Sequence, residues 1–314
     1  MLRAVSRGYL LVVLLQLFRV TMGLVNTAVR RSARLAGEKA STCTGSRTAR
    51  RSCTTTVLHG NAEGQVASKG KRARIVGNTK SPARNKKTTK PADCVERTRE
   101  KRKREEGYGM VIGIDEAGRG PFAGPVVAAA CCIPPDVNIP GIKDSKKVTE
   151  LTDREALYTE LTQAPGVRWA TAVVDNQRID EVNILEATKE AMTTCALKLC
   201  ADAPEGTKPF VFVDGNLIPP GLSSVDGECV IGGDGLEYCI AAASIIAKVT
   251  RDRMMIEFGK RWPVFGFEKH KGYGTQGHRD AIIQHGVVDI HRRSFLRKME
   301  QQLGGKLPLY ESES

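Results

Sequence analysis

Three apolar segments of this chain end in carboxylates, and this pattern constrains the fold more than any other feature. Residues 110–112 lead into Asp115 and Glu116, and two later apolar segments lead into Asp214 and Asp234. Short apolar runs of this kind predict buried strands. Carboxylates that lie together at strand ends repel one another unless a positive group neutralises them. We therefore expect this edge of the sheet to carry chemistry.

The order of strands and helices predicts the fold class. The sequence predicts strands at residues 110–115, 126–133, 167–174, 209–213 and 228–231, and helices at residues 150–163, 180–200, 236–258 and 278–285. The early strands are joined by short links and should be antiparallel, whereas the later ones alternate with helices and should be parallel. We expect an α/β fold with a mixed central β-sheet flanked by α-helices, in one domain.

Charge and cysteine content divide the chain further. The net charge is +13, made up of +18 in residues 1–107 and −5 in residues 108–314, so a nucleic-acid surface on the folded part has to be a local patch. None of the nine cysteines forms a Cys-x-x-Cys pair, which favours free thiols in a reducing compartment. We expect a folded domain at residues 108–300, between a disordered basic linker at 38–107 and a flexible tail at 301–314.

The first 37 residues have the composition of a targeting segment. They contain arginines but no acid, and the apolar stretch 9–18 is too short to span a membrane comfortably. This composition favours an organellar transit peptide, with a secretory signal or an uncleaved anchor as alternatives. Basic clusters at residues 69–74 and 101–104 could be nuclear import signals, nucleic-acid arms or parts of a solvated linker.

The four acids predict a metal site. Asp115, Glu116, Asp214 and Asp234 are oxygen ligands without a neighbouring cysteine or histidine, which suits Mg²⁺ or Mn²⁺. Two such ions about 4 Å apart can promote phosphodiester cleavage. Because successive strand residues point to opposite faces, the chain should leave the strand at the first two acids. Each acid taken alone could simply be part of a turn.

Cationic and aromatic side chains complete the predicted site. The segment Asp144-Ser-Lys-Lys147 precedes a helix and could hold phosphate. Ser244, Lys248 and Arg251 lie at i, i+4 and i+7, so they share one helix face, either along a nucleic-acid backbone or as a solvated amphipathic surface. Tyr273, in a charged glycine-rich loop, could stack on a sugar or a base, or belong to the ordinary surface.

Six motifs follow one another along the chain. They are Gly113-Ile-Asp-Glu-Ala-Gly-Arg-Gly-Pro121, Asp144-Ser-Lys-Lys147, Val213-Asp-Gly-Asn216, Ala242-Ala-Ser-Ile-Ile-Ala-Lys-Val-Thr-Arg-Asp252, His270-Lys-Gly-Tyr273 and His291-Arg-Arg-Ser-Phe295. In this order they resemble ribonuclease HII. The resemblance covers roughly residues 109–297. It implies a ribonuclease H-like fold and endonucleolytic cleavage of RNA in RNA–DNA hybrids. It also implies cutting at single ribonucleotides in duplex DNA, with 5′-phosphate and 3′-hydroxyl ends.

The same resemblance assigns roles to individual residues. The metal-binding catalytic acids for two Mg²⁺ or Mn²⁺ ions would be Asp115, Glu116, Asp214 and Asp234. The backbone loop that reads the ribose 2′-hydroxyl would be Gly118, Arg119 and Gly120, and Tyr273 would pack on the next deoxyribose. The phosphate contacts would be Lys146, Ser244, Lys248 and Arg251.

The resemblance also suggests partners, and the N-terminal sequence suggests a location. RNA–DNA hybrids and ribonucleotide-containing duplex DNA would be the substrates, in ribonucleotide and RNA-primer removal during replication and repair. The alternatives are a non-catalytic hybrid-binding protein and a nuclease of the same fold that acts on DNA alone. The bacterial-like pattern favours a monomer, without stable membrane association after processing. The arginine-rich start favours mitochondria, with the nucleus as the alternative.

Overall fold

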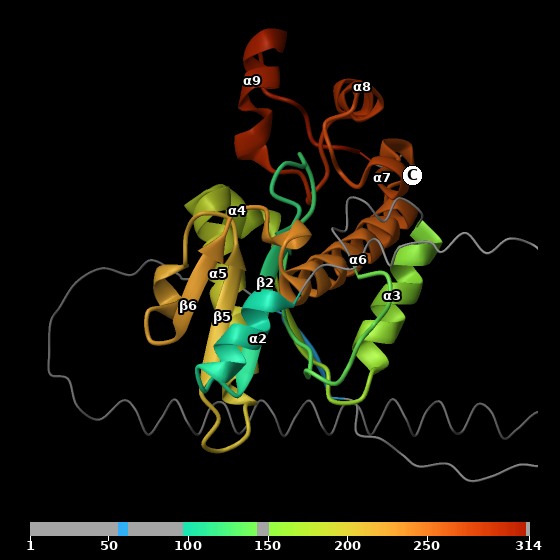
Figure 1. Ribbon diagram of the computed structural model, residues 1–314. Coiled ribbons are helices and arrows are strands. Elements are labelled where there is room, and N and C mark those ends of the chain that lie inside the picture. The colour runs from blue at the N-terminus through green and yellow to red at the C-terminus, as the bar shows by residue number, and fades with distance from the viewer. Residues whose placement is uncertain (1–55, 62–96, 143–150, 312–314) are drawn as a thin grey trace, which may run out of the picture. The chain divides into compact units, whose positions relative to one another are not determined.

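A six-stranded sheet forms the centre of the fold. The computed structural model describes residues 56–61, 97–142 and 151–311 (Figure 1). The strands are β1 (Thr56–Asn61), β2 (Met110–Ala117), β3 (Val126–Cys132), β4 (Arg168–Val174), β5 (Pro209–Asp214) and β6 (Asp226–Val230). The helices are α2 (Thr98–Glu105), α3 (Leu151–Gln163), α4 (Asn176–Val182), α5 (Ile184–Ala201), α6 (Tyr238–Arg261), α7 (Phe267–His270), α8 (Gln276–His285) and α9 (Arg293–Leu303).

The sheet is mixed, as the sequence predicts. Its strand order is β1-β4-β3-β2-β5-β6. The early pairs β2–β3 and β3–β4 are antiparallel, whereas β2–β5 and β5–β6 are parallel. The parallel half brings the carboxyl ends of β2, β5 and β6 to one edge, where ligands gather in α/β proteins.

Helices cover both faces of the sheet. On one face, Ile112 and Ile114 of β2 pack with the apolar side of α5. On the other face, α6 packs against β2 and β3. Helix α3 lies against α6 (Figure 1). A Cβ atom on Gly113 would lie 2.1 Å from the backbone carbon of Cys239, so only glycine lets the start of α6 approach β2 this closely. This contact fixes α6 beside the acidic end of β2.

The C-terminal segment forms a third apolar cluster and corrects one prediction. Residues of α7, α8 and α9 pack around Phe265 and Phe267. The segment after α9 joins this cluster, because Leu307 is buried and the backbone N–H of Tyr310 donates to Val287 O at 2.9 Å. The flexible tail expected from residue 301 is therefore wrong for residues 301–310.

The expected disordered linker is also wrong at its C-terminal end. Residues 97–106 include helix α2, and Glu100 on this helix is buried, with its Oε1 accepting from the N–H of Cys239 at 2.8 Å. Arg97 donates to three backbone carbonyls that follow β3. These buried polar contacts hold α2 against the domain, although its composition is like that of a linker. Strand β1, also in the expected linker, pairs with β4.

The long helix predicted at residues 180–200 is two helices. Asp175 caps α4 by accepting from the N–H of Arg178 at 2.8 Å. Asn183 then adopts φ 72° and caps α5 through its side chain, which accepts from the N–H groups of Leu185 and Glu186. A positive φ interrupts a right-handed helix, so α4 ends before Asn183 and α5 begins after it.

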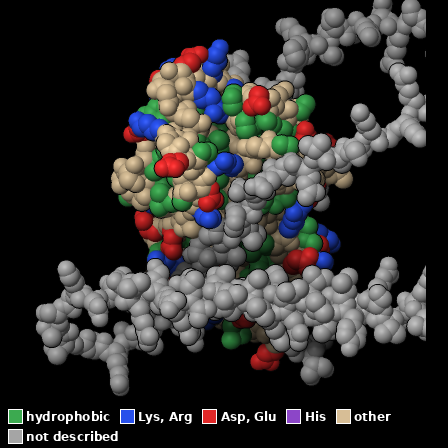
Figure 2. Space-filling model, turned by 90° about the horizontal axis from the view of Figure 1, so that it is seen from below, with side chains coloured by type: hydrophobic (Ala, Val, Ile, Leu, Met, Phe, Trp, Pro, Cys, Tyr) green, Lys and Arg blue, Asp and Glu red, His purple; other side chains and the backbone are tan. Residues whose placement is uncertain are grey.

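Charges on the surface are mixed. On the face seen in Figure 2, Lys and Arg side chains are interspersed with Asp and Glu over the described part of the chain. The six cysteines in that part are free thiols, as expected. None of its helices is both long and apolar enough to cross a membrane.

Candidate active site

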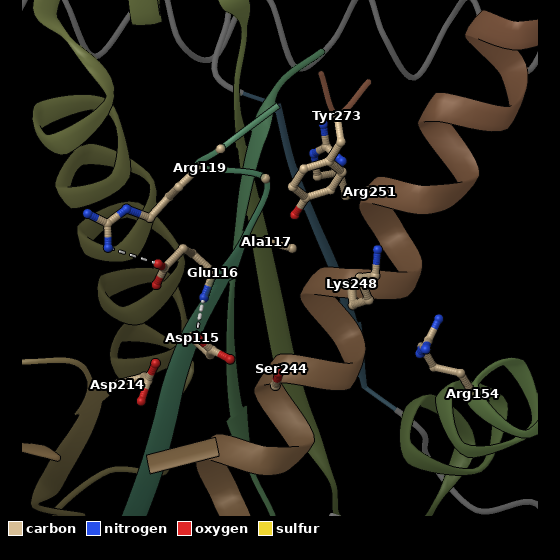
Figure 3. A pocket seen from close by; sticks show the side chains of 12 residues that line it. Asp115, Glu116, Ala117, Arg119, Arg154, Asp214, Ser244, Lys248, Arg251 and Tyr273 are labelled. Atoms are coloured by element: carbon tan, nitrogen blue, oxygen red, sulfur yellow. Dashed lines mark hydrogen bonds and ion pairs between the residues drawn. The ribbon is translucent and has the colours of Figure 1, made fainter. Parts of the chain in front are cut away.

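A cavity of about 290 Å³ opens where β2 ends. Carboxylates lie along one side of it, and Lys248 and Arg154 lie on the other side (Figure 3). The predicted site residues that line it are Asp115, Glu116, Gly118, Arg119, Gly120, Asp214, Ser244, Lys248, Arg251 and Tyr273. Residues separated by more than 150 positions in the sequence therefore meet at the edge of the sheet predicted to carry chemistry.

The two adjacent acids reach the cavity from opposite faces of one strand. β2 continues beyond both acids, so the prediction that the chain leaves the strand at this point is wrong. Asp115 lies on the α6 side and forms a hydrogen bond with Ser244, whereas Glu116 forms an ion pair with Arg119 at 3.3 Å. Both can line one cavity because it lies just past the end of the strand, where the chain turns at Gly118.

The third acid lies level with the first. Val213 of β5 pairs with Ile114 of β2, which puts Asp214 beside Asp115. Asp214 Oδ1 accepts from the N–H of Gly233 at 2.7 Å. Asp234 follows in the same 3₁₀ turn and is buried, but it is not among the residues that line the cavity. The structure therefore brings three of the four predicted acids together and leaves the fourth in the adjoining turn.

Burial and mutual repulsion shape the charge of this acidic side. Burial raises the pKa of Asp115 well above its usual range, and the charges of Glu116 and Asp214 raise it further. Burial also raises the pKa of Glu116, although Arg119 opposes this effect. The cavity thus holds carboxylates whose ionised forms are disfavoured until a positive charge compensates them.

A buried acid holds the cations of the opposite wall. Asp252 is buried, and its Oδ1 lies 2.7 Å from Lys248 Nζ, while its Oδ2 lies 3.9 Å from Arg154 Nη1. Burial lowers the pKa of Lys248, and the charge of Asp252 opposes this shift. Sequence reasoning missed Arg154, because nothing on its helix distinguishes it from an ordinary surface arginine.

Arg251 has a different role from the predicted phosphate contact. Its side chain is only 1% exposed, and its guanidinium donates to the backbone carbonyls of Pro125, Lys271 and Ala123 at 2.9, 3.0 and 3.1 Å. Burial lowers its pKa to about 10. Arg251 lines the cavity, but its donors tie together the two loops that border it.

Those two loops place glycine backbone beside an aromatic ring. Gly118 has φ 97°, and a Cβ atom on Gly120 would lie 3.6 Å from Cε1 of Tyr273. The Tyr273 side chain is 45% exposed, and its backbone carbonyl lies 2.9 Å from Nδ1 of His278. Backbone and ring together form a surface that a flat or sugar-like group can approach closely.

Comparison with known proteins decides the family. The family model for ribonuclease HII matches residues 112–298. This chain belongs to the ribonuclease HII family. Ribonuclease HII of Endomicrobium trichonymphae is 49% identical over 191 residues, which cover 60% of this chain and 87% of the relative. That of Bacillus cereus strain Q1 is 45% identical over 192 residues, covering 61% and 71%. The ribonuclease H2 structure from Pyrococcus horikoshii aligns with 27% identity and a TM-score of 0.49, over 62% of this chain and 99% of that chain.

Membership confirms the predicted enzyme class and fold. Ribonuclease HII is a ribonuclease H, so the chain is an endoribonuclease of RNA–DNA hybrids. The mixed sheet with helices on both faces is the predicted ribonuclease H-like α/β fold. Residues 1–111 precede the match to the family.

Two further residues belong to the motifs predicted from the sequence, Lys146 and Arg292. Lys146 lies outside the described residues, so its predicted phosphate contact remains a prediction. Arg292 is fully buried and donates to the carbonyls of Gly118, Arg119 and Gly124. Sequence reasoning used Arg292 only as part of a family motif, and the glycine loop gives no sign that it needs such a partner.

The acids that line the cavity suit a hard divalent cation. Asp115, Glu116 and Asp214 offer only carboxylate oxygens, and the ionised forms of Asp115 and Glu116 are disfavoured without a compensating positive charge. In the described ranges, no three His, Cys, Asp or Glu side chains converge closely enough to enclose an ion. The three carboxylates line the same cavity, so they are the residues that would hold such an ion.

Proposed function

We propose that this enzyme cuts the RNA strand of hybrids and also cuts at single ribonucleotides embedded in duplex DNA. The observation that carries the proposal is the cavity itself. It has carboxylates on one side, cations on the other, and glycine backbone with an exposed tyrosine between them. This arrangement suits a phosphodiester whose neighbouring sugar has to be recognised at close range.

The acidic side would hold the divalent ions. We assign Asp115, Glu116 and Asp214 to Mg²⁺ or Mn²⁺, with Asp234 as a fourth acid in the turn that Asp214 contacts. When bound, such ions activate water and stabilise the leaving oxygen, which would yield 5′-phosphate and 3′-hydroxyl ends. Ser244 would orient Asp115 through their hydrogen bond.

The opposite wall would hold the nucleic-acid backbone. Lys248 is 29% exposed and lies against Asp252, so it can present its ammonium group to a phosphate without losing its position. Arg154 contributes a second positive charge beside it. We keep Lys146, from the neighbouring segment of the sequence, as a further phosphate contact.

The loop at residues 118–120 would select the sugar. Only a residue without a side chain leaves room for backbone N–H groups to approach a 2′-hydroxyl, the group that distinguishes ribose from deoxyribose. Tyr273, beside Gly120, would pack on the following deoxyribose. Chemistry and sugar selection would then occupy neighbouring positions at the end of β2.

A cleavage assay with matched duplexes tests this proposal. The purified protein is incubated with Mg²⁺ or Mn²⁺ and a DNA duplex that contains one ribonucleotide, and with the same duplex carrying the 2′-deoxy nucleotide. We expect one cut at the ribonucleotide, a 3′-hydroxyl end, and no cut in the all-DNA duplex. Equal cleavage of both duplexes would refute sugar selection, and absence of cleavage with either metal would refute the proposed activity.

We further propose a monomer that works in mitochondria. The support is the acid-free, arginine-rich start of the sequence together with the hybrid substrate. The nucleus is the alternative, because of the basic clusters at residues 69–74 and 101–104. A fluorescent fusion of residues 1–107 distinguishes the two locations, and light scattering of the purified protein measures its mass in solution.

A further inference from the structure

A buried arginine stands directly behind the glycine loop. Arg292 donates from Nη2 to Gly118 O at 2.6 Å, from Nη1 to Arg119 O at 2.9 Å and from Nε to Gly124 O at 2.9 Å. The guanidinium carbon lies 5.1 Å from the ring centre of Phe295. The guanidinium therefore holds two successive peptide groups and the far end of the same loop in a fixed fork.

These contacts and the geometry of the peptide bond determine which way the N–H groups of the loop point. In a planar trans peptide, the N–H of one residue points away from the C=O of the residue before it, and the described chain has no cis peptide. Because the carbonyls of Gly118 and Arg119 point to Arg292, the N–H groups of Arg119 and Gly120 point to the other side of the loop. That side is the cavity, since residues 118–120 line it and Arg292 does not.

Both N–H groups are available to a ligand. Neither donates to an acceptor within the described residues. A 2′-hydroxyl can accept from such donors, whereas the hydrogen atom at a deoxyribose 2′ position cannot. The orientation of two amides, rather than any side chain in the cavity, would then determine which sugar is accepted.

We infer that Arg292 is a positioning residue for sugar selection: it aims the N–H groups of Arg119 and Gly120 at the ribose. The inference rests on the proposed recognition of the 2′-hydroxyl by this loop. A lysine at position 292 would keep the charge, but its single ammonium group cannot serve three carbonyls in a planar fork. Arg292→Lys should therefore release the loop while leaving the acids and Lys248 in place.

The competing explanation is that Arg292 only stabilises the fold, and the chain offers a matched control. Arg97 also donates to three backbone carbonyls, those of Ile133, Pro134 and Val137 at 2.8, 3.1 and 2.8 Å. These carbonyls follow β3 and do not line the cavity. Arg97→Lys removes a comparable guanidinium fork without touching the glycine loop.

The test compares kcat/KM for a duplex with one ribonucleotide and for the same duplex with a 2′-fluoro nucleotide, a poor hydrogen-bond acceptor. For Arg292→Lys, we expect the kcat/KM for the ribonucleotide duplex, divided by that for the 2′-fluoro duplex, to fall by about tenfold or more. This is the effect of losing one or two well-placed hydrogen bonds. Affinity for the duplex without divalent ions should change little. For Arg97→Lys, the melting temperature should fall while the ratio stays at the wild-type value.

An unchanged ratio in Arg292→Lys, or an equal fall in Arg97→Lys, overturns the inference. A wild-type enzyme that shows no preference for the ribonucleotide refutes the proposed function instead. If Arg292→Lys does not fold, amide NMR of the wild-type protein decides. The Arg119 and Gly120 protons should shift downfield on binding the ribonucleotide duplex and not the all-DNA duplex, and the absence of this difference also overturns the inference.

Discussion

The backbone of Gly118 lies so close to Arg251 that a Cβ atom at Gly118 would stand 2.1 Å from the guanidinium Nε. The same glycine has φ 97°, a conformation that side chains disfavour. Since Arg251 is buried and bonded to three carbonyls, it has no room to retreat. The loop that follows β2 and the middle of α6 are therefore packed backbone against side chain.

Gly118→Ala should strongly reduce hybrid cleavage, because the added methyl group would displace either Arg251 or the loop. Gly107→Ala is the matched control, since Gly107 has φ 96° and nothing within 4 Å of its Cβ position. We expect Gly107→Ala to lower the melting temperature through backbone strain of roughly 1–3 kcal/mol, with kcat unchanged. Equal loss of kcat in both variants would show that strain alone, and not the contact with Arg251, matters.

Asp115→Asn should abolish cleavage while leaving hybrid binding intact, because it removes a carboxylate and not the cations of the opposite wall. It should also raise the melting temperature in EDTA, since the ionised form of buried Asp115 is disfavoured by burial and by Glu116 and Asp214. Adding Mg²⁺ should stabilise the wild-type protein more than this variant. Retained cleavage would show that the assignment of Asp115 is wrong.

Tyr273→Ala should reduce cutting at a single ribonucleotide more than cutting within an RNA tract. The ring lies beside Gly120 and is half exposed, so we expect it to contact the sugar next to the one that the glycine loop selects. Tyr273→Phe keeps the ring and serves as the control, with near wild-type rates on both substrates. Equal losses on both substrates in Tyr273→Ala would contradict a role in reading the junction.

Periodicity and strand ends were enough to predict the acidic half of the site. Asp115, Glu116 and Asp214 follow apolar runs, and parallel pairing of β2 with β5 brings such ends together. The shared face of Ser244 and Lys248 follows from helical spacing alone. These features are local or depend on one pairing rule, which is why a single sequence reveals them.

The arginines could not be assigned in this way. A guanidinium donates equally well to phosphates and to backbone carbonyls, and sequence spacing does not separate the two uses. Arg251 was predicted to bind phosphate, but it holds Ala123, Pro125 and Lys271. Arg292 meets the glycine loop from more than 160 residues away. Helix α2 was missed for a similar reason, because its place depends on polar contacts with distant segments, such as those of Glu100 with Cys239 and of Arg97 with the carbonyls after β3.

A chain of neutral histidines supports the Tyr273 loop. His278 Nε2 lies 3.1 Å from His291 Nε2, and Nδ1 of His291 accepts from the N–H of Val288 at 2.9 Å. His278 Nδ1 must donate to the carbonyl of Tyr273, so His278 Nε2 accepts from His291. If His278 or His291 gained a proton, two N–H groups would face each other across a hydrogen bond. The ring of His270 also stacks on that of His278, with 4.5 Å between the ring centres.

Acid should therefore destabilise the fold through this pair. Burial lowers the pKa of His278 to about 4 and that of His291 to about 3, against about 6.5 in the unfolded chain. As the pH falls, the histidines of the unfolded state bind protons before those of the folded state. The contribution of the neutral pair to the free energy of unfolding is therefore complete above about pH 6.5 and is lost towards about pH 4. We expect the melting temperature of His278→Gln to depend less on pH in this window than that of the wild-type protein, measured by calorimetry. Parallel curves for the two proteins would contradict a buried neutral pair.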